Sequence, residues 1–524
     1  MPALGHRSRA ILVLVPAALW LAAHLVTLTR YPPMHADEAW LASGTRSILV
    51  SRSAAATEEF FRITPRSPHA IRLLFHALQA PFVAASFTLA SVRLLSLACG
   101  VGVVLLAAAM ARTLFASSAA RVSFVAFLAL DPGLFVSAHL ARSEIVLVLA
   151  FMAALALRER RRARGVGCDA TAGLILGLAV GLHPNSLIVA LAVGGVWLGD
   201  VLRGPDRARA LGRLGVLVGV TSALAFGWAA WSRSLSPSFP AALGEFGDRY
   251  GVGESLAVKL LRLPMFYGRL ADRVMGTYYV PDLRLSLLLF AVAAAASLAR
   301  LVYASVTRRP TDPAPLLALC GVNLGLVLIG KYSQPTAVLI APAGWWLVAA
   351  LVDALCLRLG APARRAAAAP VVILGALLAL GSALSARPWM GVSYSRYVKQ
   401  VREAAGEAHS VLAGPNTAFA FAPGVLRAWN DLAFLPEAGL RFADYVEREG
   451  IQVILFPEAL ETIYAERPLW NDIYGNVAPY WSDLKAFLAE RCTLVTVLDE
   501  PVFALRILPY QARSRARLFV YRVD

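Results

Sequence analysis

Long apolar runs alternate with short arginine-rich segments along the first two-thirds of the chain. A helix needs about 20 apolar residues to cross the hydrocarbon core of a bilayer. Eleven runs come close to this length, so the pattern predicts an α-helical polytopic membrane protein with about eleven transmembrane helices. The predicted spans are 11–28, 92–111, 121–138, 144–158, 171–183, 185–199, 211–231, 283–303, 314–330, 335–356 and 367–385.

The arginines between these runs predict the orientation of the helices, because cytoplasmic loops of membrane proteins carry an excess of Lys and Arg. Arg7 and Arg9 precede the first run, and five arginines lie within residues 158–164. We therefore expect the N-terminus and the inner loops to lie in the cytoplasm. Eleven crossings then leave the C-terminus outside.

The stretch 171–199 has basic segments on both sides, so it is expected to cross the membrane an even number of times. We predict two half-length helices joined by a turn at His183-Pro184-Asn185-Ser186. Irregular backbone at membrane depth requires surrounding protein or a water-filled cavity. The pair is therefore expected to face a cavity.

This topology divides the chain into a transmembrane domain, residues 1–385, and a soluble extracytoplasmic domain, residues 386–524. Two long loops of the first domain, 29–91 and 232–282, lie on the same outer side. An apolar stretch at 70–90 contains polar side chains that argue against another span, so we expect helices at the membrane interface there. These polar residues are Arg72, His76 and Gln79.

The last third has the pattern of a small α/β domain, in which short buried strands alternate with amphipathic helices. The predicted strands are 410–413, 453–456, 494–498 and 518–521, and the predicted helices are 440–449 and 479–490. Neither a glycine-rich phosphate loop nor an internal repeat is visible in the sequence.

Composition supports the membrane interpretation, because 58% of the residues are hydrophobic and only 16% are charged. The net charge of +17 raises the alternative of nucleic-acid binding. However, residues 387–524 contain 15 basic and 16 acidic residues, which leaves 35 basic and 17 acidic residues before them. The excess therefore lies in the loops between apolar runs, which is typical of cytoplasmic loops and excludes a basic groove for nucleic acid.

The first outer loop carries the most informative polar segment, Tyr31 to Trp40, with the adjacent acids Asp37 and Glu38. Two carboxylates this close raise the pKa of one of them, and such a group is suited to act as a general base. The alternative is that both acids cap a helix that begins near Ala39. The residues alone favour neither interpretation.

This segment resembles the first external loop of the GT-C glycosyltransferases, especially the protein O-mannosyltransferase and aminoarabinose-transferase branch, family 39-like. Those enzymes move a sugar from a polyprenyl-phosphate carrier to an acceptor on the outer side of the membrane. The resemblance implies that Asp37 is the catalytic base or orients the acceptor, and that Glu38 is the second member of the pair. It also makes His35 and Arg46 candidate substrate-binding residues.

Three further segments resemble the same family. Glu144 matches its second acidic position, and Arg142 is placed to meet the carrier phosphate. His183 lies in the predicted hairpin, and Lys331 and Tyr332 lie in a loop that contacts phosphate in relatives. The alternatives are structural: an acid at a helix N-terminus for Glu144, an arginine reaching the interface for Arg142, and ordinary turn or loop polarity for the others.

We therefore expect an inverting membrane glycosyltransferase with Asp37 as base, a polyprenyl-phosphate sugar as donor, and a protein, lipid or glycan as acceptor. No cofactor is expected, although His35, Asp37, Glu38 and Glu144 offer an alternative divalent-metal site. Only 4 of the 50 basic residues are Lys, which favours a GC-rich bacterium and hence its plasma membrane. The competing interpretation is a multi-span transporter or flippase of a lipid-linked substrate.

Overall fold

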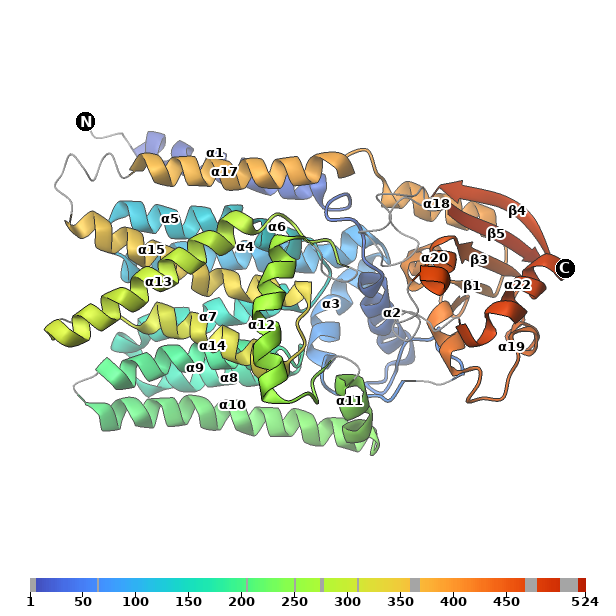
Figure 1. Ribbon diagram of the computed structural model, residues 1–524, viewed down its shortest axis with the longest axis horizontal. Helices are drawn as coiled ribbons and strands as arrows, with labels where there is room; N and C mark the ends of the chain where they lie inside the picture. Colours follow the sequence, from blue (N-terminus) through green and yellow to red (C-terminus); the bar gives the residue numbers. More distant parts are fainter. Residues whose placement is uncertain are drawn as a thin grey trace.

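The structure is a computed structural model in which helices lie side by side along the long axis and a small sheet lies at one end (Figure 1). It describes residues 6–63, 66–203, 206–248, 251–273, 278–308, 311–358, 368–466, 478–499 and 517–524.

Each of the eleven predicted spans falls on helix. The helices are α1 (His6–Thr27), α4 (Leu89–Leu114), α5 (Ser118–Leu130), α6 (Pro132–Ser137), α7 (Glu144–Arg164), α8 (Val166–Val180), α9 (Ser186–Arg203), α10 (Arg207–Leu235), α13 (Arg284–Thr307), α14 (Ala314–Ile329), η1 (Gln334–Ile340) with α15 (Ala341–Arg358), and α17 (Ala368–Ala386). Six helical segments of the described chain are long and apolar enough to cross a membrane. The number of eleven crossings stays a prediction.

The predicted pair of half-length helices requires a correction. The turn lies between α8 and α9 as expected, but α8 has 15 residues and α9 has 18. At about 1.5 Å per residue these helices are ~22 and ~27 Å long. Both extend further toward the basic end of the bundle than the apolar pattern indicated, and α9 alone qualifies as a candidate span.

Glycines allow the central helices to approach one another closely, as is common where small residues line helix interfaces in membranes. A Cβ atom at Gly321 of α14 would lie 2.3 Å from the carbonyl oxygen of Leu191 in α9. A Cβ atom at Gly173 of α8 would lie 2.8 Å from the carbonyl oxygen of Leu217 in α10. Replacing either glycine would therefore force the backbones apart.

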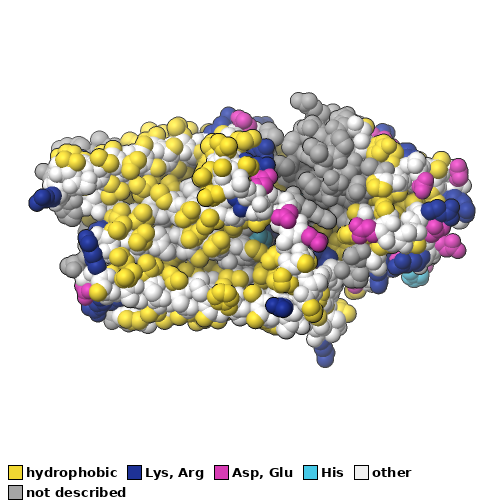
Figure 2. Space-filling view, turned by 60° about the horizontal axis from the view of Figure 1, so that its bottom comes forward, with side chains coloured by type: hydrophobic (Ala, Val, Ile, Leu, Met, Phe, Trp, Pro, Cys, Tyr) yellow, Lys and Arg dark blue, Asp and Glu magenta, His cyan; other side chains and the backbone are white. Residues whose placement is uncertain are grey.

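The two long outer loops contain the shorter helices α2 (Ala36–Ser51), α3 (Leu73–Ala85), α11 (Phe239–Asp248) and α12 (Leu256–Ala271). Helices α2 and α3 lie between the bundle and the C-terminal sheet, and α12 runs across the bundle helices (Figure 1). Hydrophobic side chains cover much of the visible side of the bundle, whereas charged side chains gather at its ends and on the C-terminal part (Figure 2).

The C-terminal part contains a five-stranded sheet in the order β2-β1-β3-β5-β4. Its strands are β1 (Val411–Ala413), β2 (Leu426–Ala428), β3 (Val453–Pro457), β4 (Cys492–Asp499) and β5 (Arg517–Val523). The first three are parallel, and β5 pairs antiparallel with both β3 and β4. Helices α18 (Tyr394–Ala405), α19 (Phe442–Arg448), α20 (Ala459–Glu466) and α22 (Trp481–Glu490) complete it, with 3-10 turns η2 (Arg387–Trp389), η3 (Pro415–Ala420), η4 (Trp429–Phe434) and η5 (Ala478–Tyr480).

The four predicted strands are present, but one of them, predicted to be buried, is largely exposed. Strand β4 lies at the end of the strand order, and most of its side chains are exposed or half-buried. Strand β2, with three residues, was too short to stand out in the apolar pattern. The sheet with flanking helices agrees with the predicted α/β domain.

The first outer loop packs directly against the C-terminal part. Met34 and Phe60 belong to the same buried cluster as Tyr397, Val411 and Phe419. Burial of apolar surface is the main stabilising contribution at such an interface. The base of α2 and the sheet therefore share one hydrophobic core.

Candidate active site

The start of α2 is held by reciprocal side-chain contacts. His35 precedes the helix, and its Nδ1 accepts a hydrogen bond of 3.1 Å from the backbone N–H of Asp37. The backbone N–H of His35 donates to Oε1 of Glu38 at 2.9 Å. These bonds satisfy amide groups that a helix N-terminus otherwise leaves without partners.

Glu38 is enclosed by other groups of the protein, which its sequence-based assignment as a catalytic residue did not anticipate. Its side chain is fully buried and accepts hydrogen bonds of 2.7 Å from Nε and Nη2 of the equally buried Arg93. The backbone N–H of Ala141 donates to the same carboxylate at 2.9 Å. Because every oxygen of Glu38 is already bonded inside the protein, we assign it a positioning role.

Arg142 brings the two predicted acidic positions together. Its Nε and Nη2 donate to the carboxylate of Glu144 at 3.1 and 3.0 Å, and its Nη1 donates to Oδ2 of Asp37. The Glu144 side chain is 3% exposed and that of Asp37 is 23% exposed. Asp37 is therefore the more exposed acid of this group. Both acids engage the Arg142 guanidinium, and its contact with a carrier phosphate stays a prediction.

Tyr278 is a further member of this group that the sequence did not single out. Its hydroxyl donates to Oδ2 of Asp37 and accepts from Nη1 of Arg142. Its ring stacks on His35 with a centroid distance of 3.7 Å and an interplanar angle of 11°. The second outer loop thus closes over the start of α2.

Two cationic side chains lie near this acidic group. Burial, followed by the positive charges of Arg72 and Arg142, lowers the pKa of Lys331 to about 8. Burial, followed by the charges of Arg66 and Arg142, lowers the pKa of Arg72 to about 10. A cation whose pKa is lowered by neighbouring positive charge gains stability when an anion binds beside it. The pair is therefore suited to a phosphate group.

The backbone at Arg72 supports a functional role. Its φ of 94° lies in a region that L-residues other than glycine rarely adopt, and its N–H donates to the carbonyl oxygen of Gly181 at 3.0 Å. Such strain concentrates at functional sites. Within the described chain no hydrogen bond or ion pair engages the Arg72 guanidinium, which leaves its donors available to a ligand.

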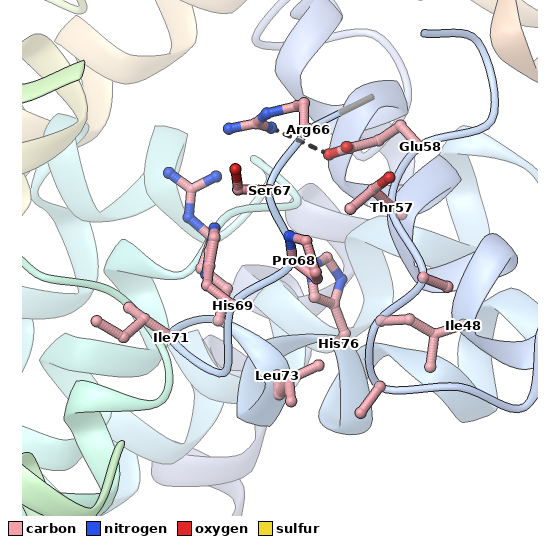
Figure 3. Close-up of a pocket in the computed structure, with 14 residues that line it drawn as sticks. Ile48, Thr57, Glu58, Arg66, Ser67, Pro68, His69, Ile71, Leu73 and His76 are labelled. Atoms are coloured by element: carbon pink, nitrogen blue, oxygen red, sulfur yellow. Dashed lines mark hydrogen bonds and ion pairs between the residues drawn. The ribbon is translucent and has the colours of Figure 1, made fainter. Parts of the chain in front are cut away.

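A small polar pocket adjoins Arg72 in the first outer loop. Figure 3 shows Arg66 turned toward Glu58, whose Oε1 lies 3.2 Å from Nη1 of Arg66. Trp40 of α2 donates its Nε1–H to the same oxygen at 2.5 Å. Arg72 lines this pocket and interacts electrostatically with Asp37, so it connects the pocket to the acidic group.

The other predicted binding residues divide into two sets. His183 is buried in the α8–α9 turn, where its Nδ1 accepts from the N–H of Asn185 at 3.0 Å, and it lies within electrostatic range of Glu144 and Lys331. Arg46 and Tyr332, by contrast, make structural contacts.

Arg46 donates to the carbonyl oxygen of Phe421 at 3.0 Å and to Glu59 at 2.8 Å. Tyr332 donates to the carbonyl oxygen of Lys259 at 2.6 Å. These bonds join neither side chain to the group around Asp37, and the substrate-binding role of both residues stays a prediction.

The missed residues differ in the signal that the sequence offered. Arg72 interrupts an apolar stretch, so its charge was visible, but no local pattern predicts its electrostatic interaction with Lys331. Tyr278 is one of several aromatic residues in a predicted loop, and Arg93 is a single arginine in an apolar run. Only contacts between segments far apart in the chain give these two a role.

A metal site at the predicted ligands does not form in this geometry. Among the described residues, no group of three or more His, Cys, Asp or Glu side chains is arranged to hold a metal ion. Glu38 turns toward Arg93. The guanidinium of Arg142 lies between Asp37 and Glu144, so a positive charge already bridges these two acids.

Comparison with known proteins gives structural but not sequence relatives. No family model matches the chain, and neither does any curated protein sequence. ArnT from Cupriavidus metallidurans, solved bound to undecaprenyl phosphate, matches with a TM-score of 0.56 and 14% identity over 98% of both chains. The apo oligosaccharyltransferase of Archaeoglobus fulgidus matches with a TM-score of 0.56 and 12% identity, over 90% of this chain and 72% of that chain.

The chain has the GT-C fold. A third solved structure, the Archaeoglobus fulgidus AglB in complex with an inhibitory peptide and a dolichol-phosphate, agrees, with a TM-score of 0.52 and 13% identity over 88% of this chain. The GT-C fold confirms the predicted resemblance at the level of architecture. At these identities it leaves the chemistry to be argued from the residues of this chain.

Proposed function

We propose that this protein is an integral-membrane glycosyltransferase that moves a sugar from a polyprenyl-phosphate carrier to an acceptor on the outer face of the membrane. The observation that carries the proposal is that one accessible carboxylate, Asp37, lies within electrostatic range of two half-buried cations, Arg72 and Lys331. A carboxylate suits an acceptor hydroxyl or amine, and the cations suit a lipid phosphate. The relatives with the same fold support this pairing, because their structures hold undecaprenyl phosphate and dolichol-phosphate.

Asp37 acts on the acceptor in the proposed mechanism. Its Oδ2 accepts a hydrogen bond from the acceptor hydroxyl or amine and takes the proton as the nucleophile attacks the anomeric carbon. The bond between that carbon and the phosphate oxygen breaks on the opposite face, so the anomeric configuration inverts. Arg142 keeps Asp37 ionised and oriented for this role.

Arg72 and Lys331 act on the leaving group. Negative charge develops on the carrier phosphate as the glycosidic bond breaks, and fixed cations in a partly dry site stabilise such charge strongly. His183 lies close enough to both cations to contribute to the same surface. The site requires no nucleotide, because the lipid phosphate already activates the sugar.

We propose that the reaction needs no obligatory divalent metal. One Archaeoglobus fulgidus oligosaccharyltransferase structure is a complex with Zn and sulfate. In this chain Arg142 supplies positive charge at the place between Asp37 and Glu144 that a metal would take. Activity that survives exhaustive chelation is the expected outcome, and loss of activity that Zn²⁺ restores would contradict it.

The two-domain division and the sidedness belong to the same proposal. We infer that residues 1–385 form the transmembrane catalytic domain and that residues 386–524 lie outside a bacterial plasma membrane, above α2. The packing of the sheet against the first outer loop supports a role in shaping acceptor access. The proposed acceptor is a protein, a lipid or a glycan.

Sugar transfer can be measured with purified protein in lipid nanodiscs and radiolabelled polyprenyl-phosphate sugars. We expect label to enter an extract of the bacterial envelope with polyprenyl-phosphate donors but not with the corresponding nucleotide sugars. Transfer from nucleotide sugars would contradict the proposed donor. If the intact labelled lipid moves across vesicle membranes and no sugar is transferred, the protein is a flippase and the proposal is wrong.

A further inference from the structure

The hydroxyl of Tyr278 is placed where the proposed function requires the acceptor. It donates to Oδ2 of Asp37, the same oxygen that faces Nη1 of Arg142. An acceptor hydroxyl or amine has to donate to this carboxylate before it loses its proton. The phenol is thus a hydroxyl group of the protein in the position of the nucleophile.

The position of Tyr278 is defined by contacts on several sides. Its ring lies parallel to the buried His35 at a centroid distance of 3.7 Å, and the Arg142 guanidinium lies 5.0 Å from the ring centroid. Its hydroxyl accepts from Arg142 while it donates to Asp37. Removing only the hydroxyl would leave the stacking intact and open the space of one water molecule beside Oδ2.

We propose that Tyr278 occupies the acceptor position at Asp37 and keeps water from it until an acceptor displaces the phenol. Tyr278 is then a residue that sets the selectivity for acceptor over water. This inference rests on the proposed glycosyl transfer, because water is the competing nucleophile in that reaction. Enzymes that handle activated groups commonly exclude water from the site to prevent hydrolysis.

The suppressed reaction is hydrolysis of the donor. A water oxygen forms a bond to the anomeric carbon, one of its protons passes to Asp37, and the bond between the anomeric carbon and the phosphate oxygen breaks. The products are the reducing sugar and polyprenyl phosphate. No oxidant, reductant or further reactant is needed.

The test compares Tyr278→Phe with the native protein in nanodiscs that contain a labelled polyprenyl-phosphate sugar and no acceptor. We expect release of labelled sugar to rise about fivefold in Tyr278→Phe, the factor set by one competing hydrogen bond. Tyr279→Phe is the matched control, because this neighbour contacts Tyr31 and Ser385 and not Asp37. Equal or slower release in Tyr278→Phe overturns the proposal.

A second measurement needs no donor and separates this inference from the proposed function. A water-soluble carbodiimide labels accessible carboxyl groups, and peptide mass spectrometry reads the labelling of Asp37. We expect Asp37 to react several-fold faster in Tyr278→Phe than in the native protein or Tyr279→Phe, whether or not sugar transfer is found. Equal rates in all three proteins overturn the inference and leave the proposed function standing.

Discussion

Asp37 and Glu38 are neighbours in sequence, yet their carboxylates have different surroundings. Successive side chains on a helix point about 100° apart. Glu38 therefore turns into the bundle toward Arg93, whereas Asp37 faces Arg142 and the outer loops. Glu38 is a buried partner that fixes the helix, and Asp37 is accessible to a substrate.

Lys331 gives the site a predictable response to pH. Its pKa of about 8 means that its proton is present below pH 8 and is lost as the pH rises through that value. A polyprenyl phosphate is mostly a dianion throughout this range. We expect its affinity for nanodisc-embedded protein to fall several-fold between pH 7 and pH 9, measured by native mass spectrometry.

Lys331→Arg is the control for this pH response, because an arginine side chain stays protonated at pH 9. The variant is expected to bind the lipid with little change in affinity between pH 7 and pH 9. A pH dependence that is equally steep in Lys331→Arg would assign it to another group.

Three charged residues of the candidate site were visible in the sequence, whereas their other contacts were not. Asp37, Arg142 and Glu144 stand out because charged residues beside apolar runs are rare and costly. Their convergence could be inferred only through family resemblance. The role of Tyr278 and the pairing of Glu38 with Arg93 depend on contacts across 241 and 55 residues, which no local pattern encodes.

At the scale of elements, α2 is the link between the bundle and the C-terminal sheet. Asp431 of the C-terminal part accepts hydrogen bonds of 2.9 and 3.1 Å from the backbone N–H groups of Arg62 and Ile63 in the first outer loop. Arg46 of α2 donates to the carbonyl oxygen of Phe421 at 3.0 Å. The C-terminal part therefore holds the first outer loop, which carries Asp37, at two places.

Asp431→Ala is expected to loosen this loop, because it removes the acceptor of two backbone N–H groups. An unsatisfied buried donor costs about 1–3 kcal/mol, and these two donors are only partly buried, so the cost for each of them lies toward the lower end of that range. Amide hydrogen exchange at residues 53–63 should become faster, and the rate of sugar transfer should fall.

Asp444→Ala is the matched control, since Asp444 pairs with the exposed Arg441 on the surface of the same C-terminal part. This variant should leave exchange at 53–63 unchanged. Unchanged exchange in Asp431→Ala as well would show that the carboxylate of Asp431 does not hold the loop.

At the scale of the whole molecule, the hydrophobic pattern predicted the positions of the long bundle helices in the described chain. It could do so because lipid-facing and buried segments must both be apolar. It misjudged lengths where charged residues extend a helix beyond its apolar run, as in α9. It also missed the exposure of β4, since apolar strands occur at sheet edges as well as in cores. The fold shared with the two solved structures agrees with the architecture that the family resemblance implied.

The most direct test of the account is transfer of radiolabelled sugar from a polyprenyl-phosphate donor by Asp37→Asn, compared with the native protein. Asn keeps the size of the side chain but removes its charge and basicity, and Asp282→Asn provides a control at an outer-loop acid paired with Arg284. We predict a loss of at least about a hundredfold for Asp37→Asn, the range for one general base, and near-native transfer for Asp282→Asn. Equal transfer by all three proteins would contradict the assignment of Asp37 as the base.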